Sequence, residues 1–83
     1  MVAKKDKYFK IIGKNIRRYR KLKGLSQQTL ANLCEKVDRA KISDIENAKE
    51  DFMYSTLIEV CLALELSPDD IVGEKGADFY KDN

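Results

Sequence analysis

The sequence predicts an all-α fold, a single compact domain of five helices. Apolar residues recur three and four positions apart through most of the chain, which is the pattern of one buried helix face. Residues that start or stop helices separate these stretches: Gly24, Ser26, Asp38, Ser67 and Pro68. A chain of 83 residues is long enough for one such domain with a modest core.

The first helix is predicted over residues 8–23. Its inner face carries residues at three- and four-residue spacing: Phe9, Ile12, Ile16, Tyr19 and Lys23. Its outer face is expected to be basic, with Lys14, Arg17, Arg18 and Lys21. Residues 1–7 precede it as a polar, lysine-rich stretch, which we expect to be a flexible basic segment.

Two short helices joined by a tight connection are predicted next. Gly24 stops the first helix because glycine adopts a left-handed backbone at little cost. Ser26 stands where it can cap a helix over residues 27–34, and Asp38 where it can cap a helix over residues 39–47. The inward-facing residues of these two helices are expected to be Leu30, Ala31, Cys34, Ile42 and Ile45.

Two further helices complete the predicted domain, which spans residues 8–73 and is followed by a tail, residues 74–83. The helix over residues 55–65 has an apolar stripe of Leu57, Val60, Cys61 and Leu64, widened by Ile58 and Leu62. Ser67, Pro68 and two acids then start a short helix that Gly73 ends. Before these helices lies an apolar cluster that either joins the core or forms a contact surface: Phe52, Met53 and Tyr54.

Charge is distributed unevenly along the chain, although its net value is only +2. Residues 1–25 hold ten Lys/Arg against the single acid Asp6, which gives +9. Residues 26–83 hold six Lys/Arg against thirteen Asp/Glu, which gives −7. This asymmetry favours one face that binds a polyanion and an acidic face elsewhere, although a solvated basic helix would have the same composition.

The residue types that most catalytic and metal sites need are scarce. The sequence has no histidine, no glycine-rich phosphate loop and no nucleophile–base pair, so we expect neither an enzyme nor a cofactor. Cys34 and Cys61 fall on apolar helix faces and are expected to be reduced core residues without a metal. No stretch approaches roughly 18 apolar residues and no signal peptide is recognisable, so a cytoplasmic protein without a membrane partner is expected.

Many of these residues match, in order, the motifs of a known family. The match comprises Gly24, Leu25, Ser26, Gln27, Leu30, Ala31, Ile42, Ser43, Ile45, Glu46 and Asn47, and extends to Ile12, Ile16, Arg20, Leu57, Val60, Cys61, Leu64, Ser67, Pro68 and Ile71. Over roughly residues 8–72 the chain resembles the lambda-repressor/Cro-like (Xre) helix-turn-helix family. The resemblance implies a sequence-specific regulator of transcription that binds double-stranded DNA, a repressor or a phage or mobile-element controller. Its recognition helix, residues 38–47, would enter the major groove.

The resemblance also nominates individual DNA contacts. The candidates for reading bases are Arg39, Ala40, Ser43 and Asp44. Arg39 suits guanine, because a guanidinium can hold guanine O6 and N7 together, or else it contacts phosphate alone. The candidates for phosphate contacts are Gln27, Gln28, Arg17, Lys41, Asn47 and Lys49. Gln27 and Gln28 alternatively serve only as polar surface, and residues 1–7 are either an arm along DNA or a solvated tail.

Two further expectations concern packing and partners. In the family the arginine that matches Arg20 pairs with the glutamate that matches Glu46, which clamps the first helix to the recognition helix. A homodimer over a near-palindromic site is expected because one motif buries little surface. Its contact candidates are Ile71, Val72, Phe79 and Tyr80. The alternative from another class is a protein-interaction module, or an antitoxin-like partner, built on the same fold.

The chain departs from the family pattern at two places. The segment between the second and third helices is one residue longer than usual, and Glu35 with Lys36 replaces the turn glycine. We expect a wider connection, which could shift the DNA-facing residues by one position. Ala48 replaces the glycine after the recognition helix, so the left-handed backbone either falls on Ala48, costing roughly 1 kcal/mol, or passes to Asn47.

Overall fold

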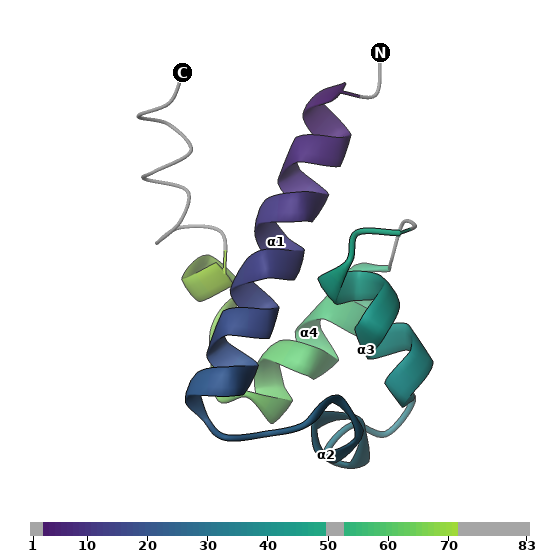
Figure 1. The fold of residues 1–83 in the computed structure, drawn as a ribbon, viewed down its shortest axis with the longest axis vertical. Helices are drawn as coiled ribbons and strands as arrows, with labels where there is room; N and C mark the ends of the chain where they lie inside the picture. The colour runs from purple at the N-terminus through teal and green to yellow at the C-terminus, as the bar shows by residue number, and fades with distance from the viewer. Residues whose placement is uncertain (1–2, 50–52, 72–83) are drawn as a thin grey trace.

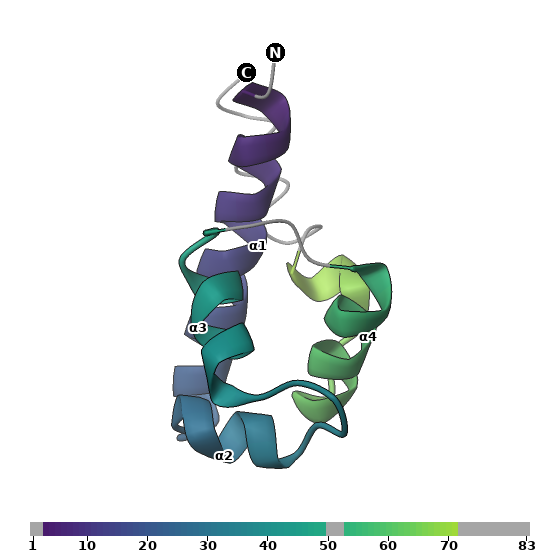
Figure 2. The same ribbon diagram turned by 90° about the vertical axis from the view of Figure 1, so that its right-hand side faces the viewer.

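The computed structural model describes residues 3–49 and 53–71, and these form the all-α fold that the sequence predicts. Its helices are α1 (Ala3–Leu22), α2 (Gln27–Asn32), α3 (Arg39–Glu46) and α4 (Tyr54–Ala63), and residues 68–71 form a fifth helical turn. The long α1 runs the height of the molecule, with α3 beside it and α2 across its lower end (Figure 1). In the side view α3 and α4 stand opposite each other, and α2 lies below α3 (Figure 2).

Several helix boundaries differ from the predicted ones. α1 begins at Ala3 instead of at the predicted Tyr8, so residues 3–7 belong to the first helix. That stretch contains neither glycine nor proline, and alanine and lysine are good helix formers. α2 ends at Asn32, before Cys34, and α3 ends at Glu46 with Asn47 as its C-cap.

The predicted starts of α2 and α3 are confirmed. Ser26 Oγ accepts a hydrogen bond from the Thr29 amide at 3.0 Å, and Asp38 Oδ1 accepts one from the Lys41 amide at 2.8 Å. Each bond satisfies an amide that has no partner inside its helix. These two caps set where the two motif helices begin.

Three helices end in the same hydrogen-bonded motif. The residue after the C-cap has a left-handed backbone, with φ of 73° at Gly24, 53° at Ala48 and 60° at Glu65. At the end of α3, the Ala48 amide donates to the Ile45 carbonyl and the Lys49 amide to the Asp44 carbonyl. This is the Schellman pattern, and it favours glycine. The left-handed position after α3 therefore falls on Ala48 and does not pass to Asn47.

The core lies between all five helices. Its buried apolar residues are Ile12, Ile16, Leu30, Ala31, Val37, Ile42, Ile45, Leu57, Val60, Cys61, Leu64 and Ile71. Leu62 does not widen this core, since it is 70% exposed. Met53 and Tyr54 are 71% and 70% exposed, so the core interpretation of their cluster is wrong for them, and Phe52 lies outside the described residues. Lys23 is also exposed, because the inner stripe of α1 ends at Tyr19.

Two buried residues of α1 tie it to its neighbours. A Cβ added to Gly13 would lie 2.4 Å from the Ile45 carbonyl oxygen, so α1 approaches α3 as closely as backbones allow. The Asn15 side-chain amide, which is also buried, donates to the Ile71 carbonyl and holds the fifth helix. The sequence reasoning missed both positions, although a glycine inside a helix is a known signal of close packing.

Candidate nucleic-acid interface

The C-terminal end of α3 is locked to α1 by a buried ion pair. Arg20 Nε donates to Glu46 Oε2 at 2.5 Å and Arg20 Nη2 donates to Glu46 Oε1 at 3.0 Å. The side chains are only 8% and 2% exposed, respectively. Arg20 Nη1 also donates to the Leu25 carbonyl at 2.7 Å, so the guanidinium is bonded on three nitrogens. The clamp that the family resemblance implies is therefore present in this chain.

Gln27 joins the same network from α2. Its side-chain Nε2 donates to Glu46 Oε1 at 3.1 Å, so the glutamate receives bonds from both neighbouring helices. Gln28, the next residue, donates instead to Asn32 Oδ1 at 2.9 Å within α2. In both contacts the side-chain nitrogen is the donor, so the side-chain oxygens of Gln27 and Gln28 take no part in them. The start of α2 is thus fixed relative to the end of α3.

The outer face of α3 carries the residues that the sequence nominates for base reading. Ile42 and Ile45 point into the core, which leaves the opposite face to Ala40, Asp44 and Asn47 at 4- and 3-residue spacing. Arg39 and Ala40 are exposed at the first turn, while Ser43, Asp44 and Lys41 are partly buried. The structure therefore gathers these candidates on one helix that no other described element covers on its outer side.

Asn47 has a local bonding partner at the end of α3. Its Nδ2 donates to the Ser43 carbonyl at 2.9 Å, and Ser43 Oγ lies 3.4 Å away. Lys49 follows, exposed, just after the Schellman motif. These two phosphate candidates lie at the opposite end of α3 from Arg39.

A basic strip of α1 borders the surface of α3. Gly13 and Arg20, seven residues apart, contact α3. The neighbouring strip of the same helix carries exposed cations at 3- and 4-residue spacing: Lys10, Lys14, Arg17 and Lys21. Arg18 is partly buried, in contrast to its expected outward position, and its guanidinium lies 4.7 Å from the centre of the Tyr19 ring. Lys14 and Arg17 are therefore the cations of this strip that lie between the two contact points.

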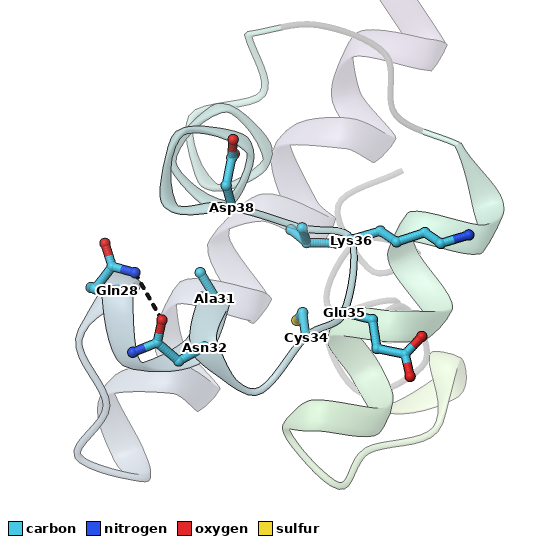
Figure 3. Close-up of a pocket in the computed structure, with 8 residues that line it drawn as sticks. Gln28, Ala31, Asn32, Cys34, Glu35, Lys36 and Asp38 are labelled. Carbon is cyan, nitrogen blue, oxygen red and sulfur yellow. Dashed lines mark hydrogen bonds between the residues drawn. The ribbon is translucent and has the colours of Figure 1, made fainter.

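The connection between α2 and α3 borders a shallow hollow of about 500 Å³. Figure 3 shows Gln28 and Asn32 of α2 on one wall, joined by their hydrogen bond, and the connection with Cys34, Glu35 and Lys36 on the other. Glu59 of α4 holds this connection, since its Oε2 accepts from the amides of Glu35 and Lys36. The sequence reasoning missed Glu59, although it is the single charged residue of α4.

Both cysteines are free thiols in the core region, as expected. Burial raises the pKa of the Cys61 thiol to about 11, and Asp70 adds to the shift. Burial also raises the pKa of Cys34, with the charge of Glu59 as the second cause. Protonated thiols are poor nucleophiles and metal ligands. Among the described residues, no group of three or more His, Cys, Asp or Glu could hold a metal ion.

The four candidates for a dimer contact divide into two cases. Ile71 is completely buried in the core of its own chain, so it is not available to a partner and that assignment is wrong. Val72, Phe79 and Tyr80 lie outside the described residues. Within residues 3–49 and 53–71, no helix is both long enough and apolar enough to cross a membrane.

α2 and α3 are two short capped helices, and the Arg20–Glu46 pair clamps α3 to α1 while its outer side stays exposed. This arrangement defines a helix-turn-helix protein. A helix-turn-helix family model of the Cro/C1, Xre-like type matches residues 16–71. The chain therefore belongs to this family of DNA-binding regulators. No curated protein and no solved structure gives a match.

Proposed function

We propose that this protein is a sequence-specific regulator of transcription, acting as a repressor or as the controller of a phage or other mobile element. The observation that carries this proposal is the exposed outer face of α3, held rigidly by the Arg20–Glu46–Gln27 network. Reading of bases needs side chains at defined positions. A helix that is anchored by a buried ion pair and its hydrogen bonds holds its outer side chains at such positions.

In this proposal the first turns of α3 enter the major groove. Arg39 holds guanine O6 and N7, and Ala40 contacts a thymine methyl group. Ser43 and Asp44 face the next base pairs, where Asp44 accepts from a cytosine amino group or orients Arg39. Phosphates are contacted by Gln27, Gln28, Arg17, Lys41, Asn47 and Lys49. Exposure of Arg39 and Ala40, and the position of Arg17 beside α3, support these roles.

The protein is proposed to bind as a homodimer. Two copies would place their α3 helices about 34 Å apart, one turn of DNA, over a near-palindromic site. The buried Ile71 removes one candidate contact. Exposed apolar side chains of α4 and its N-cap are the better candidates within the described residues: Met53, Tyr54 and Leu62.

The same exposed side chains favour a second candidate function, a protein-interaction module. Tyr54 and Leu62 are exposed, and Ile58 between them is partly buried. The three are four residues apart on α4 and so share one face of it. That face carries no charged residue, in a chain in which 36% of residues are charged. In an antitoxin-like protein such a face would bind a different protein instead of a second copy.

Selection from a randomised pool of DNA duplexes, at two salt concentrations, tests the proposal. A two-fold symmetric motif, bound less tightly as salt rises, is expected, because released counterions make phosphate contacts salt-dependent. Arg17→Gln should weaken binding to all sequences equally and reduce the salt slope by about 1. The control is Lys23→Gln, at the C-cap of α1, where the lysine lies 3.8 Å from Glu65. Weak binding without any motif would instead favour the protein-interaction module.

A further inference from the structure

The connection between α2 and α3 is held by a side chain from outside the helix-turn-helix motif. Glu59 lies in the middle of α4, and one of its carboxylate oxygens, Oε2, accepts from two consecutive backbone amides, those of Glu35 and Lys36. The bond to the Lys36 amide is 3.0 Å long. Two consecutive amides that point to one oxygen form an anion-binding concavity, and here the anion is part of the chain itself.

These bonds complete the hydrogen bonding of the widened connection. The amides of Leu33 and Cys34 donate to α2, to the carbonyls of Leu30 and Ala31, each at 3.0 Å. The next two amides, of Glu35 and Lys36, have no helix to donate to, and Glu59 accepts from both. Val37 is then buried in the core, and Asp38 caps α3. The additional residue of the connection is thus accommodated by a carboxylate.

The two ends of α3 are consequently held by separate devices. Its C-terminal end is held by the buried Arg20–Glu46 pair, which connects it to α1. Its N-terminal end follows directly from the connection that Glu59 holds against α4. Arg39 and Ala40, the exposed residues of the first turn, lie at this second end.

We propose that Glu59 is a positioning residue for DNA recognition, which fixes the N-terminal end of α3 and so selects the base pairs that Arg39 and Ala40 read. This inference rests on the proposed function. In this proposal Glu59 does not touch DNA, because its carboxylate is bonded to the amides of Glu35 and Lys36. Loss of its carboxylate releases the first turn of α3 and leaves the clamp at the last turn intact.

The test compares Glu59→Ala and Glu59→Gln with the unchanged protein, and Glu65→Gln is the matched control. Glu65 is a neighbouring acid on the surface, with only a 3.8 Å contact to Lys23 Nζ. Amide hydrogen exchange at Glu35 and Lys36 reports whether the hydrogen bonds from these two amides to Glu59 are present. Duplex selection reports the preference at each base pair, and the salt slope reports the phosphate contacts.

Glu59→Ala should expose the two amides to exchange and reduce the preference at the base pairs next to Arg39, on the order of tenfold. The salt slope and the preference at other base pairs should stay unchanged. Glu59→Gln should restore the motif, because its amide oxygen can still accept both bonds. Glu65→Gln should behave as the unchanged protein.

Other results would overturn the inference. Equal weakening on all sequences would make Glu59 a purely structural residue, and an unchanged motif despite lost protection would remove its positioning role. If Glu59→Ala does not fold, the same measurements are made on Glu59→Asp. Aspartate keeps the negative charge, but its side chain is one methylene shorter, so its carboxylate lies farther from the two amides. A relaxed preference at the same base pairs supports the inference, and an unchanged motif overturns it. An unchanged protein that selects no motif would refute the proposed function itself, whatever the exchange data show.

Discussion

Arg20 and Glu46 lie 26 residues apart in the sequence, yet Arg20 Nε and Glu46 Oε2 are separated by 2.5 Å in the structure. The pair joins the last turn of α1 to the last turn of α3, and both side chains are nearly inaccessible to water. A buried charge without its partner is far more costly than a buried pair. The orientation of α3, and with it the proposed DNA-reading face, therefore depends on an ion pair that itself reads no base.

Arg20→Met should destabilise the protein by about 3–5 kcal/mol, because it leaves the Glu46 carboxylate buried with only Gln27 as a donor. The methionine fills part of the space, so a helical circular dichroism spectrum should persist at low temperature. Thermal unfolding measures the loss, and Arg17→Met, at an exposed position of the same helix, is the control. An unchanged Tm would show that the pair contributes nothing to stability.

Arg39→Ala should weaken binding to the preferred duplex by about 1–3 kcal/mol and flatten the preference at one base pair. The reason is that a guanidinium distinguishes guanine from the other bases through two acceptors at once. Binding titrations with the preferred duplex and with single-base variants measure this, with Lys36→Ala as a control at a nearby exposed cation. If affinity fell equally on every duplex, Arg39 would be a phosphate contact.

Gly13→Ala should destabilise the protein, although alanine is the better helix former by about 1 kcal/mol. The added methyl group would stand 2.4 Å from the Ile45 carbonyl oxygen and 2.9 Å from that of Glu46. Both neighbours are backbone atoms, so α1 and α3 must separate, and overpacking of this kind costs roughly 1–3 kcal/mol. Chemical denaturation measures the change against Lys14→Ala, at the next and exposed position. A stabilised Gly13→Ala protein would contradict the close approach of the two helices.

Ala48→Gly should stabilise the protein by up to about 1 kcal/mol. The residue has a φ of 53°, a left-handed conformation in which the alanine Cβ is strained and glycine is not. Part of this gain is offset, because glycine also makes the unfolded chain more flexible. The change should raise Tm by a few degrees, and the same substitution at Ala40, inside α3, should lower it. A lower Tm for Ala48→Gly would mean that the greater flexibility of glycine in the unfolded chain costs more free energy than the relief of backbone strain contributes.

The local features of this fold could be predicted from the sequence because their causes are local. A serine or aspartate caps the helix that follows it within three residues, as Ser26 and Asp38 do. The spacing of Leu57, Val60 and Leu64 on α4 is enough to identify its inner face. The pairing of Arg20 with Glu46 followed from the order of motifs shared with a known family.

Tertiary structure decided what depends on contacts between distant segments. Leu62 is as apolar as the core residues, and only the position of α4 leaves it exposed, whereas Ile71 is buried and its carbonyl accepts a hydrogen bond from Asn15 of α1. Glu59 meets the amides of Glu35 and Lys36 across more than twenty residues, and no spacing rule connects these positions. The sequence by itself thus determined where α2 and α3 begin and the main inward-facing residues of each helix, because these depend on neighbours along the chain. Which surfaces remain free, and how the connection before α3 is held, depended on how the helices pack.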